Sequence, residues 1–89
     1  VNTEKEQRML SYAEQKAREK SLRKAEKRVK EAEGRISELE AAQQELEKRL
    51  SSGDASQEVL DSYAANSAAL ESAMTEWEEA QNELDSLGA

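Results

Sequence analysis

The residues with the clearest chemical potential are positive charges that recur along one stretch of the chain. Their spacing alternates between four and three residues, in the row Lys16, Lys20, Arg23, Lys27 and Lys30, with Lys24 beside it. On a helix, residues at these spacings share one face, and this row covers about 20 Å of it. Such a row neutralises successive phosphates, so it predicts a salt-sensitive, sequence-independent contact with DNA or ribosomal RNA.

The same face also has a purely structural interpretation. Acidic residues are interspersed among the bases and are spaced to form pairs along one helix: Glu19, Glu26, Glu31 and Glu33. No aromatic residue lies among the bases to stack on a nucleobase. A solvated helix face with internally balanced charge therefore stays open beside phosphate binding.

The composition excludes most other site chemistry. The chain has no Cys and no His, so thiolate nucleophiles, the usual general base and the usual metal ligands are absent. It has no Gly-rich phosphate loop. Carboxylates such as Glu78 and Glu79 are abundant, but an open rod gives them no concave, dry site. We therefore expect a non-catalytic chain with no catalytic, cofactor-binding or metal-binding residues.

The charge is divided unevenly along the chain. The net charge is −7, yet all 13 Lys and Arg residues precede Ser51, and the residues from Ser51 onward are acidic or neutral. The second half must therefore be balanced by the first half or by a partner. No apolar run approaches the roughly 20 residues of a membrane span, and the N-terminus does not resemble a signal peptide. We expect a cytoplasmic protein without a membrane contact.

Apolar residues at alternating spacings of three and four form two seams, which predict two coiled-coil helices. The first seam consists of Leu22, Ala25, Val29, Ala32, Ile36, Leu39, Gln43, Leu46 and Leu50. The second consists of Val59, Tyr63, Asn66, Leu70, Ala73, Trp77, Ala80, Leu84 and Leu87. Between them, Gly53 can end one helix and Asp54, with Gln57, can cap the next. This tight turn predicts an antiparallel hairpin.

The two seams complement each other if Leu50 faces Val59. That alignment sets the only two polar seam residues, Gln43 and Asn66, against each other and places Trp77 opposite an alanine as a core residue. The flanking positions then predict two ion pairs between the helices. They are Arg28 with Glu83 and Arg35 with Glu76.

The expected fold is all-α, a two-helix antiparallel coiled-coil hairpin over residues 11–87. The first helix is expected over about 11–51, the turn over 52–54 and the second helix over about 55–87, with residues 1–10 a linker or frayed turn. Ser11 with Glu14 forms a capping pair, and Thr3 with Glu6 is a weaker alternative start. Residues 11–21 lack a partner helix, so they predict a segment that docks elsewhere or is loosely ordered.

The order of features resembles a known domain. The features are Leu10-Ser11-Tyr12, a basic early helix, Ile36-Ser37-Glu38-Leu39-Glu40, a short turn, Thr75-Glu76-Trp77-Glu78-Glu79 and a final Leu84. Together they resemble the C-terminal coiled-coil domain of ABC-F family ATPases, which include Uup-like and elongation factor 3-like ABC proteins. Because the sequence begins at Val1 rather than Met, we also expect it to be part of a longer chain.

The resemblance implies a cytoplasmic ABC transporter-type ATP-binding protein without a membrane domain, acting on ribosomes or linked to DNA. ATP and magnesium would bind elsewhere in that parent protein, and this hairpin would be a monomeric arm that contacts nucleic acid or modulates the ATPase domains of the same chain. The bases from Lys16 to Lys30 are the positions suited to that role. The alternative is a structural or protein-docking coiled coil of an unrelated scaffold.

Overall fold

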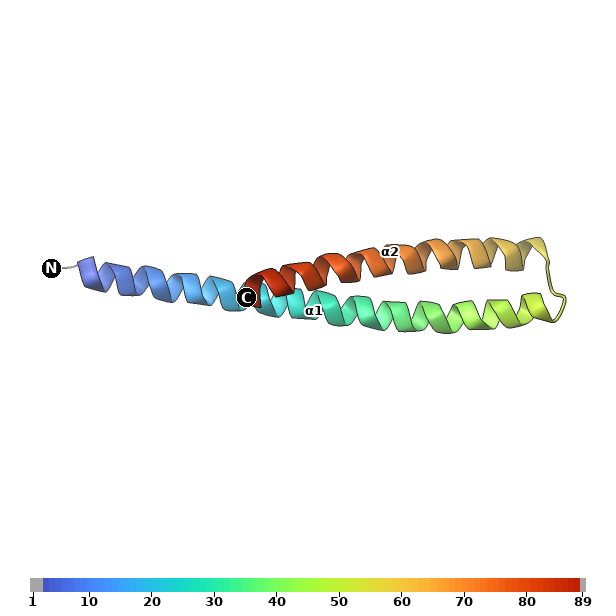
Figure 1. The fold of residues 1–89 in the computed structure, drawn as a ribbon, viewed down its shortest axis with the longest axis horizontal. Helices are drawn as coiled ribbons and strands as arrows, with labels where there is room; N and C mark the ends of the chain where they lie inside the picture. The colour runs from blue at the N-terminus through green and yellow to red at the C-terminus, as the bar shows by residue number, and fades with distance from the viewer. Residues whose placement is uncertain (1–2, 89) are drawn as a thin grey trace.

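The chain folds into two long helices that run antiparallel (Figure 1). The computed structural model describes residues 3–88, with side chains from Ser11 onward. Helix α1 spans Thr3–Ser51 and helix α2 spans Gln57–Gly88. The rod they form measures 79 × 16 × 15 Å. This confirms the all-α, antiparallel coiled-coil hairpin.

The predicted seams form the contact between α1 and α2. Every seam residue is buried or half-buried, and the most buried are Ala25, Val29, Ala32, Val59, Ala73 and Ala80. Burial of apolar area is the main stabilising term in such a pair, and here it comes from a single narrow line of side chains. The rod therefore has a thin core that runs along its length.

The register of the two helices is also as predicted. The Nδ2 of Asn66 donates to Oε1 of Gln43 at 2.7 Å and to the carbonyl of Leu39 at 2.9 Å. The Nε2 of Gln43 donates in turn to Oγ of Ser67 at 3.0 Å. The two seam amides therefore satisfy each other within the core, which a shifted register would prevent.

One of the two predicted ion pairs between the helices is present in the structure. Arg28 bonds Glu83, with 2.7 Å between Nη1 and Oε2, as expected. The pairing of Arg35 with Glu76 is wrong, because Glu76 Oε1 lies 2.8 Å from Nη2 of Arg28 instead. A single forked guanidinium reaches both carboxylates, which lie two turns apart on α2. Arg35 is left exposed on α1.

The turn begins with the left-handed glycine expected from the sequence. Gly53 has a φ of 96°, a conformation that residues with a Cβ rarely adopt. Its N–H donates to the carbonyl of Leu50 at 3.1 Å, and the N–H of Asp54 donates to the carbonyl of Arg49 at 2.9 Å. These two bonds form a Schellman motif, which satisfies the last carbonyls of α1.

The cap of α2 differs from the prediction of Asp54. The Schellman motif occupies the N–H of Asp54 that a capping box with Gln57 would use, and α2 starts two residues later than expected, at Gln57. Ser56 is the N-cap: its Oγ accepts from the N–H of Val59 at 3.4 Å, and its carbonyl accepts from the N–H of Leu60 at 3.0 Å.

The start of α1 also differs from the prediction. The helix begins at Thr3, which was the weaker of the two expected starts, rather than near Ser11, so residues 3–10 are helical and do not form a linker. Residues 1 and 2 lie outside the described part of the chain. The stretch from Glu4 to Leu10 contains Glu, Lys, Gln, Arg, Met and Leu, all good helix formers, and neither Gly nor Pro interrupts it.

Because α1 is longer than α2, its first turns extend past the end of the hairpin (Figure 1). At the boundary, Nε and Nη2 of Arg18 donate to the carbonyl of Leu87 at 3.1 and 2.7 Å. The last turn of α2 has no basic residue, so Arg18 supplies the positive charge that favours a helix C-terminus. Residues 3–17, which precede this contact, are called the overhang below.

Candidate nucleic-acid interface

The six predicted bases form one solvent-facing surface on α1, called the basic face below. It consists of Lys16, Lys20, Arg23, Lys24, Lys27 and Lys30, and each of these side chains is exposed. The neighbouring seam residues Ala25 and Val29 are buried against α2, so helical periodicity turns these bases away from it. The hairpin therefore leaves the basic face free.

Neighbouring carboxylates neutralise the basic face only weakly. Lys16 pairs with Glu19 at 3.7 Å and Lys27 with Glu31 at 3.9 Å, and all four side chains are largely exposed. Pairs this long and exposed contribute little free energy. Four bases have no ion pair within the described residues: Lys20, Arg23, Lys24 and Lys30. Acids on the same helix therefore pair with only two of the six bases.

The acids of α2 do not compensate the basic face either. The acids of α2 that pair with α1 are Glu76 and Glu83. Both bind Arg28, on one flank of the seam. The hydrogen bonds that Arg28 donates to Glu76, and the attraction of both carboxylates, raise the pKa of Arg28 above its ordinary value. Arg28 is therefore fixed in a cross-helix contact.

One aromatic ring lies at the end of the basic face, which the sequence analysis missed. Lys16 Nζ lies 5.6 Å from the centre of the Tyr12 ring, and Tyr12 is 63% exposed. The signal in the sequence was the four-residue spacing, which puts two side chains on the same helix face. Tyr12 gives the basic face one surface on which a base can stack.

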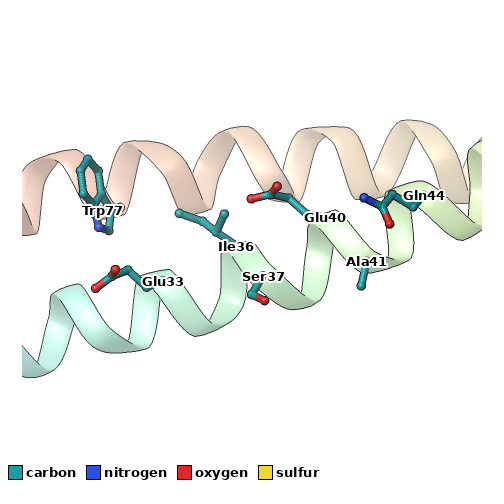
Figure 2. A pocket seen from close by; sticks show the side chains of 7 residues that line it. All are labelled: Glu33, Ile36, Ser37, Glu40, Ala41, Gln44 and Trp77. Carbon is teal, nitrogen blue, oxygen red and sulfur yellow. The ribbon is translucent and has the colours of Figure 1, made fainter.

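A shallow groove of about 500 Å³ lies on one flank of the hairpin (Figure 2). It is called the Trp77 groove below, and its lining consists of Glu33, Ile36, Ser37, Glu40, Ala41 and Gln44 from α1 and Trp77 from α2. Trp77 was expected to be a core residue. It is only half-buried, because its indole extends from the seam into the groove wall.

Other chemistry has no visible site in the described part of the chain. Among those residues, no three His, Cys, Asp or Glu side chains lie close enough together to hold a metal ion. Each buried polar side-chain atom there has a hydrogen-bond partner. Neither helix, over the same residues, has an apolar stretch long enough to cross a bilayer.

Comparison of the chain with protein-family models, with curated proteins and with solved structures finds no match.

Proposed function

We propose that this chain is a non-catalytic accessory arm whose basic face contacts the phosphates of DNA or ribosomal RNA. The observation that carries the proposal is the set of four exposed bases without an ion pair: Lys20, Arg23, Lys24 and Lys30. Unpaired, aligned cations can neutralise phosphates and so release the counterions that are condensed on a polyanion, which drives binding. A helix face that served only for solubility would not need its positive charges concentrated between residues 16 and 30.

The shape of the arm also suits this function. From Lys16 to Lys30 the bases follow one side of a continuous helix for about 20 Å, which matches several successive phosphates of a nucleic-acid strand. Lysine and arginine contacts to phosphate position a protein without reading sequence. The proposed contact is therefore tolerant of sequence, and Tyr12 at its end adds one stacking interaction.

The setting that we propose for the arm is a cytoplasmic ABC-F type ATPase, in which it would be the C-terminal domain. The support is the likeness of short segments, such as Thr75-Glu76-Trp77-Glu78-Glu79, to that family's coiled coil. In that setting other domains bind ATP and magnesium.

A second candidate function is docking on another protein domain, including the ATPase domains of the same chain. It is favoured by the overhang, where Tyr12 is exposed on a helix that has no partner helix in this hairpin. An exposed aromatic ring at the end of a rigid helix fits a groove on another domain.

The test of the proposed function is a binding titration with short duplex DNA and with structured RNA at several salt concentrations. One variant replaces the unpaired bases Lys20, Arg23, Lys24 and Lys30 with Gln, and a control replaces Arg35, Lys48 and Arg49, which lie nearer the turn. We expect the first variant to bind more weakly and to reduce the salt slope by about 0.9 per lost phosphate contact, while the control binds as wild type. Equal binding by all three proteins would contradict the proposal.

A further inference from the structure

The two flanks of the hairpin differ in how their charges are used. On one flank, Arg28 joins the helices through Glu76 and Glu83. On the other flank, Glu26, Glu33 and Glu40 recur every seven residues along α1, and all three are exposed. None of the ion pairs in the described residues involves these three glutamates. The second flank thus has acids available for a partner.

Apolar groups accompany these free glutamates. Glu33 and Glu40 line the Trp77 groove together with Ile36 and the half-buried Trp77. One turn from Trp77 on the same side of α2, Met74 is 44% exposed. An apolar floor beside an acidic wall selects a ligand with apolar and basic groups on one face.

The α1 wall of the groove has the geometry of a helix-packing surface. It consists of Glu33, Ser37, Glu40 and Gln44, at spacings of four, three and four residues (Figure 2). Residues at these spacings form a straight row on one side of a helix. A second helix packs along such a row when its own residues repeat at the same spacing.

The overhang and the residues that follow it carry the matching row. Tyr12, Lys16, Glu19 and Arg23 have spacings of four, three and four residues, and all are exposed. In antiparallel alignment with the groove wall, the four layers are Arg23 with Glu33, Glu19 with Ser37, Lys16 with Glu40, and Tyr12 with Gln44. Each base meets an acid, and the one acid meets a serine.

A two-fold axis between the two copies adds further charge pairs to these four layers. If the first copy places Lys16 against Glu40 of a second copy, the second copy places its Lys16 against Glu40 of the first, and Lys30 meets Glu26 near the axis. An isologous interface requires this kind of self-complementary pattern. The alignment brings no two acids and no two bases together along the row.

We propose that two copies of the chain associate in antiparallel fashion, with residues 12–23 of each copy in the Trp77 groove of the other. The association covers Tyr12 and gives Glu33 and Glu40 the partners they lack within one chain. Because its charge pairs are at the surface, it weakens as salt rises. It does not depend on nucleic-acid binding, although it shares Lys16, Arg23 and Lys30 with the basic face, so a polyanion competes with it.

The test is a charge-swap experiment followed by sedimentation equilibrium at low salt, without nucleic acid. One variant carries Lys16→Glu and Arg23→Glu, and the other carries Glu33→Lys and Glu40→Lys. Each variant alone sets like charges against each other and is expected to be monomeric, whereas an equimolar mixture restores every pair and forms a heterodimer. Circular dichroism confirms that both variants keep the helical fold.

The alignment is tested by cysteine cross-linking. The double variant Glu19→Cys with Ser37→Cys places facing thiols in the dimer, while within one chain these positions lie about 27 Å apart along α1. We expect oxidation to cross-link the double variant and to leave each single variant uncross-linked, since a parallel pair would cross-link the single variants.

Three results would overturn the inference. The first is a wild-type chain and a variant mixture that both stay monomeric, which would leave the groove to a basic helix of another protein. The second is dimerisation that persists in each charge-swap variant alone. The third is cross-linking of the single cysteine variants.

Discussion

The seam near the open end of the hairpin and the seam near the turn are built from different residues. Towards the open end, Ala25 and Ala80 are fully buried and Ala32 is 2% exposed. Towards the turn, Leu46 and Leu50 are only half-buried although they are larger and more apolar. Small side chains let two helices approach until water is excluded, whereas larger ones hold the axes apart. Along this seam, burial therefore depends on side-chain size as well as on hydrophobicity.

The largest expected effect comes from enlarging a residue in the alanine-rich part. Ala80→Leu forces extra methyl groups into a contact with no free space, and overpacking of this kind costs about 1–3 kcal/mol of unfolding free energy. The measurement is urea unfolding followed by circular dichroism. Ala64→Leu is the matched control, because Ala64 is exposed on the same helix. Equal stability of the two variants would mean that the helices do not pack closely at Ala80.

A smaller effect is expected in the polar layer of the part near the turn. Gln43→Leu removes the acceptor of one Asn66 hydrogen bond and the donor to Ser67, so we expect a loss of about 1 kcal/mol. Changing Gln43 and Asn66 together to Leu should restore the stability but weaken the preference for one register. Unfolding measures the first outcome, and disulfide trapping of shifted registers measures the second. A single variant as stable as wild type would show that the amides do not stabilise the seam.

These contrasts also show how far the sequence determined the fold. The register could be predicted because Gln43 had one polar counterpart and the turn fixed the offset. The Ser56 cap could not, since the Schellman bonds at Gly53 use the backbone of the favoured Asp54. The start of α1 at Thr3 was only the weaker of the two expected starts, because the capping pair at Ser11 outweighed the helix-forming residues before it.

The candidate site was predictable to a similar extent. The basic face followed directly from helical spacing, and each of its bases is exposed as that spacing required. The fork of Arg28 between two glutamates depends on side-chain rotamers, which spacing does not specify. The Trp77 groove depends on the half-buried indole, and a heptad assignment treats every seam residue as fully enclosed.

At the junction of the two parts lies Gly34, where a stabilising change is expected. It is exposed in the middle of α1, and a Cβ built there meets nothing within 4 Å. Gly34→Ala should therefore raise the unfolding free energy by roughly 0.5–1 kcal/mol through helix propensity. Gly53→Ala is the contrasting variant and should lower stability, because Gly53 has a positive φ. Thermal unfolding of both variants measures these changes in stability. Destabilisation by Gly34→Ala would reveal a contact at that position.

The smallest effect is expected for Arg28→Gln, which removes the cross-helix ion pairs of the part near the open end. We expect a slight drop in the melting temperature at low salt that disappears at high salt. Because the pKa of Arg28 is raised, its contribution is complete below the ordinary arginine pKa and is lost only above it. The difference from wild type should therefore be the same at neutral and mildly alkaline pH. Arg35→Gln is the control, and an equal drop there would contradict the role of Arg28.

The contact between Arg18 and the carbonyl of Leu87 gives the rod a defined mechanical response. It closes the hairpin at the end where α1 continues past α2. A pulling force between those two residues acts across the helices rather than along them, so it unzips the seam one layer at a time. Arg18 would be released first, the alanine layers next and the Gln43–Asn66 layer late, with the Gly53 turn as the final hinge. Such a rod yields gradually when peeled from this end, yet resists when both helices are pulled lengthwise in opposite directions.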